Sequence, residues 1–261
     1  MGKIIAIVNQ KGGVAKTTTA VNLAAAIAER GFKVLLVDMD PQGNATSGVG
    51  VERRNIEHCV YDVLINDAPP QAVIIKSEFR NLDIMPATIQ LAGAEVELVT
   101  AISRENKLRR AVRPLSPFYD FIFIDCPPSL GLLTVNALTL ANSLIVPLQC
   151  EYYALEGLSQ LLNTYKIVQK SLNKELQLEG VLLTMYDQRT NLSAQVASEA
   201  RSYFGNKVYE TMISRSVKLS EAPSHGVPGV FYDRHNKGAE EYQRLATEFL
   251  EKQQLGGVKD E

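Results

Sequence analysis

The fold of this chain is decided by one stretch near its start: Ile4-Ile5-Ala6-Ile7-Val8-Asn9-Gln10-Lys11-Gly12-Gly13-Val14-Ala15-Lys16-Thr17-Thr18. The apolar run Ile4–Val8 predicts a buried strand, and the apolar spacing from Thr18 to Glu29 predicts a helix. A glycine-rich segment between a strand and a helix offers backbone N–H groups and the positive end of the helix dipole, which together bind anions. The stretch therefore predicts a phosphate-binding loop.

Single residues of this loop have different expected roles. Lys16 is placed to reach terminal phosphates, and the Thr17 hydroxyl to bind Mg²⁺. The alternative is an ordinary glycine-rich turn with surface lysines, but such a turn would not need the second lysine, Lys11. Ala15 is unexpected, because phosphate-binding loops carry glycine directly before the lysine.

The composition is that of an ordinary soluble globular enzyme. Of the 261 residues, 46% are hydrophobic and 21% are charged, and the formal net charge is −2. No global basic field therefore indicates a nucleic-acid partner, and any DNA binding has to come from a local patch.

The cysteines and the termini indicate the compartment. Cys59, Cys126 and Cys150 are odd in number and lack paired metal-ligand spacing, which favours small buried side chains in a reducing cytosol. Met1 leads almost directly into the first predicted strand, so we expect no signal peptide. No apolar stretch reaches the ~20 residues that span a bilayer. We expect a soluble, cytoplasmic protein.

Strand-like and helix-like segments alternate along the whole chain. The predicted strands are Ile4–Val8, Val34–Val37, Leu82–Met85, Phe121–Ile124, Ser143–Pro147, Leu178–Thr184 and Val208–Ile213. The predicted helices are Thr17–Arg30, Leu91–Val99, Lys107–Arg113, Leu132–Ala141, Ala154–Ser171, Leu192–Phe204 and Gly238–Gln253. This alternation predicts one doubly wound α/β domain over residues 1–254, with a mostly parallel sheet and helices on both faces. Residues 255–261 are expected to form a polar, fraying C-terminal tail.

Acidic residues follow two of the predicted strands. Asp38 and Asp40 end one apolar run, and alternation along an extended chain points both to the same side. Asp125 ends another apolar run, as a metal-facing acid does in other phosphate-loop enzymes. A lone acid at a strand end is often a helix cap or a turn residue. Three such acids beside this loop favour a nucleotide site, with the stronger catalytic case for Asp40.

These segments together resemble the ParA/MinD branch of phosphate-loop (P-loop) ATPases, whose deviant Walker A loop carries a signature lysine. Within that branch the chain is similar to short, chromosomal-type ParA (Soj-like) partition ATPases. The resemblance rests on Lys11–Thr18, Val37–Thr46, Phe123–Ser129, Val146–Glu151, Tyr186–Thr190 and Leu219–Pro223. It covers nearly the whole chain, which makes it more specific than the loop alone.

The resemblance implies an ATPase that uses ATP and Mg²⁺. The residues that would bind the nucleotide are Lys11, Gly12, Gly13, Val14, Ala15, Lys16, Thr17, Thr18, Met185 and Pro223. Lys16 would contact the β- and γ-phosphates and Thr18 the α-phosphate, while Met185 and Pro223 would lie near the adenine. Thr17 and Asp125 would hold Mg²⁺.

The catalytic residues implied by the resemblance are Lys11, Lys16 and Asp40. Lys11 would cross the interface of an ATP-sandwich homodimer and reach the partner's nucleotide, and Asp40 would orient the attacking water. The family pattern has glycine at Ala15. Either the methyl group is tolerated as a natural variant with altered affinity, or it is an introduced change that weakens nucleotide binding or arrests the cycle, and we expect impairment.

The implied partners are non-specific double-stranded DNA and a ParB-type centromere-binding protein that stimulates hydrolysis and releases the dimer from the nucleoid. Expected phosphate contacts are Arg189, Arg215 and Lys218, with Arg201, Lys207 and Arg234 as outer possibilities. Nearby acids, Asp187, Glu199 and Glu221, leave open that these are scattered solvated charges.

Several rival functions share this fold. A MinD-like, membrane-associated positioning ATPase would use the same nucleotide site, but the polar C-terminal tail lacks a membrane-binding pattern. A carboxylate–amine ligase of the dethiobiotin synthetase kind would not require the signature lysine. An iron–sulfur protein of the nitrogenase-reductase kind is disfavoured because Cys126 directly follows the Mg²⁺-linked acid Asp125. A purely structural DNA-binding protein would need none of these acids.

Overall fold

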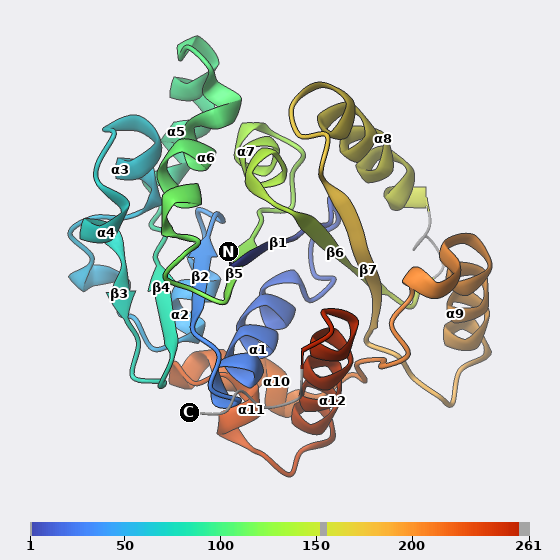
Figure 1. Cartoon of the computed structure of the whole chain (residues 1–261). Coiled ribbons are helices and arrows are strands. Elements are labelled where there is room, and N and C mark those ends of the chain that lie inside the picture. Colours follow the sequence, from blue (N-terminus) through green and yellow to red (C-terminus); the bar gives the residue numbers. More distant parts are fainter. Residues whose placement is uncertain (1, 152–155, 256–261) are drawn as a thin grey trace.

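Seven strands form a single sheet in this computed structural model, which describes residues 2–151 and 156–255 (Figure 1). The strands are β1 (Lys3–Ile7), β2 (Val34–Asp38), β3 (Ile75–Lys76), β4 (Leu82–Met85), β5 (Phe121–Asp125), β6 (Ser143–Gln149) and β7 (Gln177–Thr184). Their order across the sheet is β3-β4-β2-β5-β1-β6-β7. Every neighbouring pair is parallel except β3 and β4. The predicted doubly wound, mostly parallel α/β fold is confirmed.

Helices connect the strands and cover both faces of the sheet (Figure 1). The α-helices are α1 (Lys16–Glu29), α2 (Asn44–Gly48), α3 (Val60–Ile65), α4 (Pro70–Val73), α5 (Leu91–Glu97), α6 (Lys107–Val112), α7 (Leu132–Leu140), α8 (Glu156–Ser171), α9 (Asn191–Phe204), α10 (Val217–Glu221), α11 (Gly229–Tyr232) and α12 (Lys237–Lys252). Short 3₁₀ helices are η1 (Arg53–Asn55), η2 (Leu98–Thr100), η3 (Arg104–Asn106), η4 (Arg113–Leu115), η5 (Gly205–Lys207) and η6 (Ala222–His225).

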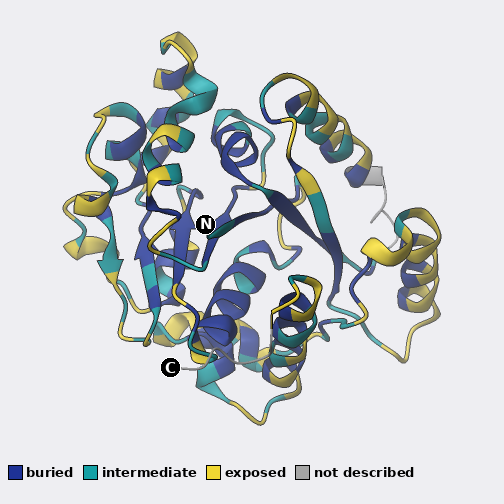
Figure 2. Ribbon diagram, viewed as in Figure 1, coloured by how far each residue is buried: buried dark blue, intermediate teal, exposed yellow. Residues whose placement is uncertain are grey.

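Two hydrophobic clusters, one on each face, hold the layers together. Along β1, Ile4 and Ala6 pack into the cluster that the helices α3 and α5–α9 cover, whereas Ile5 and Ile7 pack into the cluster that α1 and α12 cover. Successive residues of a strand point to opposite faces, so a strand buried on both sides is apolar throughout. Figure 2 shows the result, with buried strands at the centre and exposed residues on the outer sides of the helices.

The prediction of a strand over Val208–Ile213 is wrong. The chain makes one isolated bridge to β7 there, between Val208 and Val181, and a second bridge joins Ser214 to Tyr186 just beyond both segments. The N–H groups of Glu210 and Thr211 donate instead to the Glu248 carboxylate of α12, both at 2.9 Å. Because a side chain takes these backbone donors, no continuous ladder with β7 forms.

The seventh strand is β3, at the other edge of the sheet, where it pairs antiparallel with β4. Its two residues, and the short helices α2, α3, α4, α10 and α11, are too brief to produce a periodic sequence pattern. The longer helices agree with the prediction to within a few residues. Residues 154 and 155 of the predicted helix Ala154–Ser171, and residues 256–261 of the predicted tail, lie outside the described residues.

Candidate nucleotide-binding site

The loop between β1 and α1 has the left-handed backbone geometry of a phosphate-binding turn. Gly13 has φ of 74°, and Ala15 has φ of 67° and ψ of 32°. Ala15 is the N-cap of α1, and its carbonyl accepts the Thr19 N–H at 2.9 Å. A left-handed conformation is free for glycine but costs an L-residue roughly 1–2 kcal/mol. Ala15 therefore adopts a left-handed backbone conformation that alanine disfavours.

The Lys16 side chain folds back over the loop. Its Nζ donates to the Lys11 carbonyl at 2.8 Å, and the residue is 7% exposed. Burial lowers the pKa of Lys16, while the nearby Asp125, Cys126 and Asp40 oppose that shift. An ammonium group held here, among the backbone N–H groups of the loop, is a built-in partner for an anion.

Thr17 and Asp125 come together at the carboxyl ends of β1 and β5. In the parallel pair, Ile7 lies opposite Asp125, and the Thr17 hydroxyl donates to Asp125 Oδ2 at 2.7 Å. The other carboxylate oxygen, Oδ1, is buried and has no hydrogen-bond partner among the described residues. Burial and the charge of Asp38 raise the pKa of Asp125. An orphaned, buried carboxylate oxygen next to a hydroxyl fits a hard cation such as Mg²⁺.

Such a cation would depend on the nucleotide for further ligands. Within the part of the chain that the structure describes, no group of three or more His, Cys, Asp or Glu side chains is arranged to hold a metal. Mg²⁺ is usually bound by one or two protein groups, waters and substrate phosphates. The pair of Thr17 and Asp125 fits this mode of binding.

Asp38 and Asp40, at the end of β2, have distinct surroundings. Asp38 is fully buried and accepts bonds from the Thr46 N–H (2.8 Å), the Thr46 hydroxyl (2.7 Å) and the Asp40 N–H (3.1 Å). Burial raises the pKa of Asp38 to about 6, although the bonds from Thr46 oppose the shift. Asp40 Oδ1 accepts only the Gln42 N–H, at 2.9 Å, among the described residues. Asp38 supports the turn that carries Asp40.

Two adjoining cavities lie beside the first turn of α1. One, of about 310 Å³, is lined by Ala15, Thr18 and Met185 among others; the other, of about 420 Å³, is lined by Thr17, Thr18 and Pro223 among others. Thr18, Leu219 and Ser220 line both cavities. Of the two residues predicted near the adenine, Met185 therefore lines the smaller cavity and Pro223 the larger one.

The Lys11 side chain has an acidic partner outside the loop. Its Nζ forms an ion pair with Glu151, which follows β6. The two side chains are 42% and 32% exposed, so the pair lies at the surface of the site. In this chain Lys11 is accordingly held by an acid of its own protomer.

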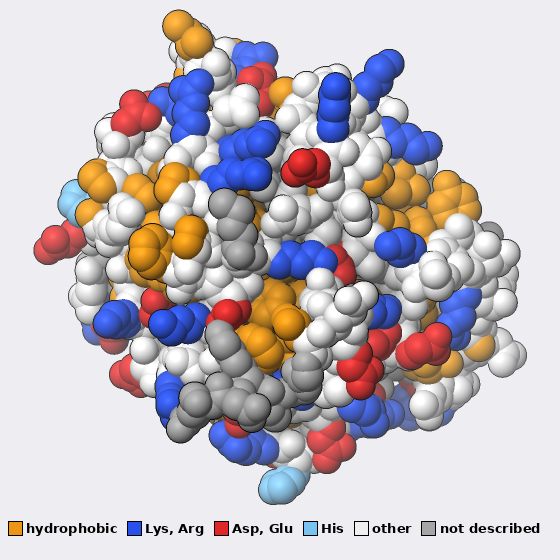
Figure 3. Space-filling model, viewed as in Figure 1, with side chains coloured by type: hydrophobic (Ala, Val, Ile, Leu, Met, Phe, Trp, Pro, Cys, Tyr) orange, Lys and Arg blue, Asp and Glu red, His pale blue; other side chains and the backbone are white. Residues whose placement is uncertain are grey.

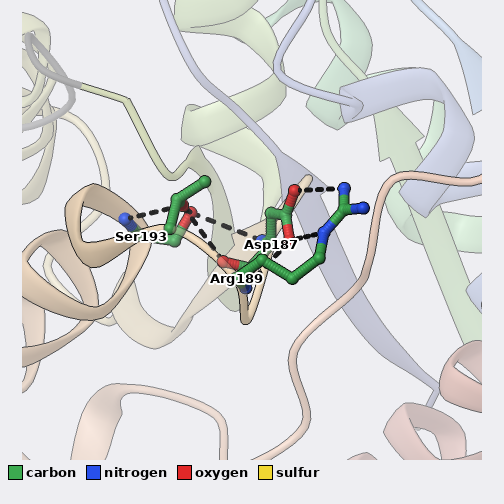
Figure 4. A network of polar contacts seen from close by, with 4 residues as sticks. Asp187, Arg189 and Ser193 are labelled. Atoms are coloured by element: carbon green, nitrogen blue, oxygen red, sulfur yellow. Dashed lines mark hydrogen bonds and ion pairs between the residues drawn. The ribbon is translucent and has the colours of Figure 1, made fainter.

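The residues predicted to contact DNA lie on two neighbouring segments beyond β7. An isolated parallel bridge joins Tyr186 to Ser214, which brings the segment before Arg189 next to the one that carries Arg215. Arg189 Nε and Nη2 donate to Asp187 at 2.9 and 2.8 Å, and the Asp187 N–H bonds to Ser193 in the same network (Figure 4). These bonds from Arg189 lower the pKa of Asp187.

Two of the other five predicted cations are paired as well. Lys218 is paired with Glu221 at 3.0 Å, and Arg234 with Glu29 at 3.0 Å. Arg215 has no ion pair among the described residues, and it lines the cavity that contains Met185. Arg201 and Lys207 lie at the end of α9 and in η5. The local basic patch is therefore partly neutralised by its own acids.

One residue near the site was not foreseen. Arg53, of η1, donates to the Gln42 carbonyl and, at 2.8 Å, to the Ser47 hydroxyl. It thereby ties α2 to the turn that carries Asp40. No sequence motif marks this arginine, because its partners are a carbonyl and a hydroxyl brought near by the fold.

The strand–loop–helix, the paired lysines and the strand-terminal acids define a phosphate-loop nucleoside triphosphatase fold. Residues 2–178 match the model of the AAA domain family. The chain is 62% identical to the sporulation initiation inhibitor protein Soj of Bacillus subtilis (strain 168), over 95% of this chain and 98% of Soj. It is 54% identical to the chromosome partitioning protein ParA of Myxococcus xanthus, over 97% of this chain and 89% of that protein. The chain belongs to this AAA domain family and, within it, to the ParA/Soj ATPases.

Solved structures of similar fold carry nucleotide and magnesium. A cobyrinic acid a,c-diamide synthase from Mycobacterium smegmatis, with bound ADP and magnesium, is 40% identical with a TM-score of 0.83, covering 94% of this chain and 93% of that one. The septum site-determining protein MinD of Pyrococcus horikoshii, complexed with Mg-ADP, is 29% identical with a TM-score of 0.79, covering 95% and 96%. ATP and Mg²⁺ were the predicted cofactors, and these neighbours agree with that prediction. No helix within residues 2–151 and 156–255 is long and apolar enough to cross a bilayer.

Proposed function

We propose that this chain is a ParA-type partition ATPase that hydrolyses ATP with Mg²⁺, binds DNA as an ATP-dependent sandwich dimer, and drives DNA segregation with a ParB-type partner. One observation carries the proposal: Thr17 of the Lys11–Thr18 loop bonds to one oxygen of the buried Asp125, whose other oxygen has no partner among the described residues. The chain that contains this site is 62% identical to Soj. The relative named as a chromosome partitioning protein, ParA, at 54% identity, supports the partition role.

The loop residues would bind the triphosphate with little rearrangement. The Lys16 ammonium would exchange its bond to the Lys11 carbonyl for the β- and γ-phosphate oxygens, and the Thr18 region would contact the α-phosphate. Thr17 and Asp125 would hold Mg²⁺, whose charge would offset that of the phosphates. The adenine would occupy the cavity at Met185, because Ala15 and Thr18 line the same space.

Asp40 would orient the attacking water by accepting a hydrogen bond from one of its O–H groups. Its position is fixed from two sides, by the bond from its own N–H to Asp38 and by the bond from the Gln42 N–H to its Oδ1. Holding a reactant in place lowers the entropic part of the barrier. The catalytic role of Asp38 is then indirect.

Lys11 would act across the dimer interface. To reach the partner's nucleotide it has to leave Glu151, its partner within the protomer. A lysine that is paired in the monomer and released in the dimer would add positive charge to the transition state only after two protomers have met. ATP binding and dimerisation would thus precede hydrolysis.

DNA would bind to Arg189, Arg215 and Lys218. Their acids, Asp187 and Glu221, reduce the charge of a single protomer, so two copies in a dimer would be needed for firm binding. Contacts with phosphates release counterions, and affinity should fall steeply with salt. The protein would be cytoplasmic and associated with the nucleoid, with residues 1–254 acting as one domain.

The test is retention on a double-stranded DNA column with Mg-ATP across a salt series. We expect retention with ATP, loss of retention as salt rises, and no retention of a Lys16→Ala variant. Arg189→Glu should abolish retention while ATP-dependent dimerisation survives, and Lys174→Glu, at an exposed lysine between α8 and β7, serves as the control. Retention that does not depend on ATP, or that does not fall as salt rises, would contradict the proposal.

Two rival activities have their own outcomes. A MinD-like membrane ATPase would pellet with anionic lipid vesicles in the presence of ATP, which we do not expect. The neighbour named as a cobyrinic acid a,c-diamide synthase suggests a small-molecule ligase on this fold. The ParA-type activity is favoured because the identity to Soj, at 62%, exceeds the 40% to that neighbour. DNA-stimulated ATP turnover without any added carboxylate would separate the two.

A further inference from the structure

A hollow lined by three arginines lies away from the nucleotide site. It measures about 560 Å³ and is lined by Asn106, Arg109, Arg110, Arg113, Pro114 and Pro117. None of the described residues that line it carries a carboxylate. Lys and Arg side chains gather in the upper central part of Figure 3, where α6 lies in Figure 1.

The arginines lie on α6 and on the first residue of η4, which follows it directly. Leu108 and Val112, four residues apart, are buried and fix one face of α6 in the core. Arg109 and Arg113, also four apart, lie on the adjoining flank and are half-buried. Like charges at this spacing repel each other, so the arrangement costs stability until an anion is present.

None of the three guanidinium groups forms an ion pair with a described residue. Two cations just before them in the sequence are paired, Lys107 with Asp67 at 2.8 Å and Arg104 with Glu105 at 3.1 Å. Guanidinium groups offer planar forks that match carboxylate or phosphate oxygens two at a time. The hollow therefore presents unpaired anion-binding groups.

The apolar surroundings indicate what kind of anion fits. Pro114 and Pro117 line the hollow, and the adjacent Phe118 is 68% exposed. A nucleic-acid duplex keeps its bases stacked inside and exposes mainly phosphates and sugars, whereas a peptide that mixes acidic and apolar residues can pair the arginines and cover the ring. The observations favour a peptide.

The location leaves the nucleotide site free. Pro114 and Pro117 precede the beginning of β5, at Phe121, and the Gly2 N–H bonds to the Ser116 carbonyl between them at 2.8 Å. The phosphate-binding loop follows the opposite end of the neighbouring strand β1. A peptide bound here would not block ATP.

We propose that the Arg109–Arg110–Arg113 hollow is a docking site for an acidic, partly apolar peptide segment of another protein. This proposal does not depend on the partition function, because the hollow shares no residue with the nucleotide site or the proposed DNA contacts.

The test is fluorescence anisotropy with the full chain and a labelled peptide of alternating glutamate and leucine. We expect salt-sensitive binding that an Arg110→Ala/Arg113→Ala double variant weakens about tenfold or more, since it removes two charge-assisted contacts. Lys174→Ala should bind like the parent. Urea unfolding should show no loss of stability in the double variant, because it removes mutual repulsion.

Three results would overturn the proposal. One is equal binding of a peptide with glutamine in place of glutamate, and another is unchanged binding by the double variant. The third is retention of a short DNA duplex that the double variant loses while the glutamate peptide fails to bind, which would make the hollow a nucleic-acid contact.

Discussion

Replacing Ala15 by glycine tests the backbone argument at the centre of the site. Ala15 has φ of 67° and ψ of 32° without help from a side-chain cap. An L-residue in this region pays roughly 1–2 kcal/mol, and glycine recovers it at an entropic cost of about 0.5–1 kcal/mol in the unfolded chain. We expect Ala15→Gly to raise the free energy of unfolding by about 1 kcal/mol, or the melting temperature by about 2–3 °C.

The matched control is the same substitution where the backbone is right-handed. Ala194 is exposed in α9, and Ala194→Gly should lower the free energy of unfolding by about 1 kcal/mol. Urea titrations of the three proteins, read by circular dichroism, give both changes. Effects of the same sign at both sites would refute the reasoning, because alanine and glycine would then differ only in general helix propensity.

ATP turnover of the same variant tests the second part of the argument. If the methyl group at Ala15 slows the cycle, as the family pattern suggests, Ala15→Gly should hydrolyse ATP faster than the parent. Equal turnover with increased stability would leave the strain argument intact and contradict the impairment.

Three further predictions concern contacts around the site and the C-terminal helix. Thr46→Val should destabilise the fold by about 2 kcal/mol in urea unfolding, because the buried Asp38 carboxylate loses one of its donors and the buried Ala87 N–H loses its acceptor; Thr46→Ser should restore most of the stability. Burial alone would raise the pKa of Glu248, but the bonds from the Thr211 and Glu210 N–H groups outweigh it and lower this pKa below 4.5. The stability that ionised Glu248 contributes is therefore present above that pH and is lost as the pH falls below it. The urea midpoint of Glu248→Gln should accordingly change less than that of the parent between about pH 5 and pH 3. Glu151→Gln should free Lys11 and raise ATP turnover at low protein concentration, whereas unchanged turnover would mean that the ion pair does not restrain this lysine.

The sequence predicted the parallel core because its strands are long apolar runs covered on both faces. It also predicted which acids end those strands. It could not predict that Asp38 lies opposite Asp125 in the β2–β5 ladder, because register depends on packing between distant segments. Nor could it predict the two bonds from Thr46 that distinguish the buried Asp38 from Asp40.

The sequence-based prediction failed where a distant side chain, not a neighbouring strand, accepts the backbone N–H groups. Val208–Ile213 has the apolar content of a strand, yet Glu248, distant in sequence, accepts the N–H groups that a ladder would use. Arg53 was missed for a similar reason, since its two partners carry no charge. Local patterns contain no information on such long-range polar contacts.

The edges of the sheet bear on solubility. At one edge the two-residue β3 runs antiparallel to β4 and ends in Lys76, and at the other the chain around Val208 and Ser214 partly covers β7. An open strand edge invites pairing with any other exposed strand and so promotes aggregation. The short, charged strand β3 at one side and the irregular cover of β7 at the other therefore leave little open strand edge for pairing between sheets.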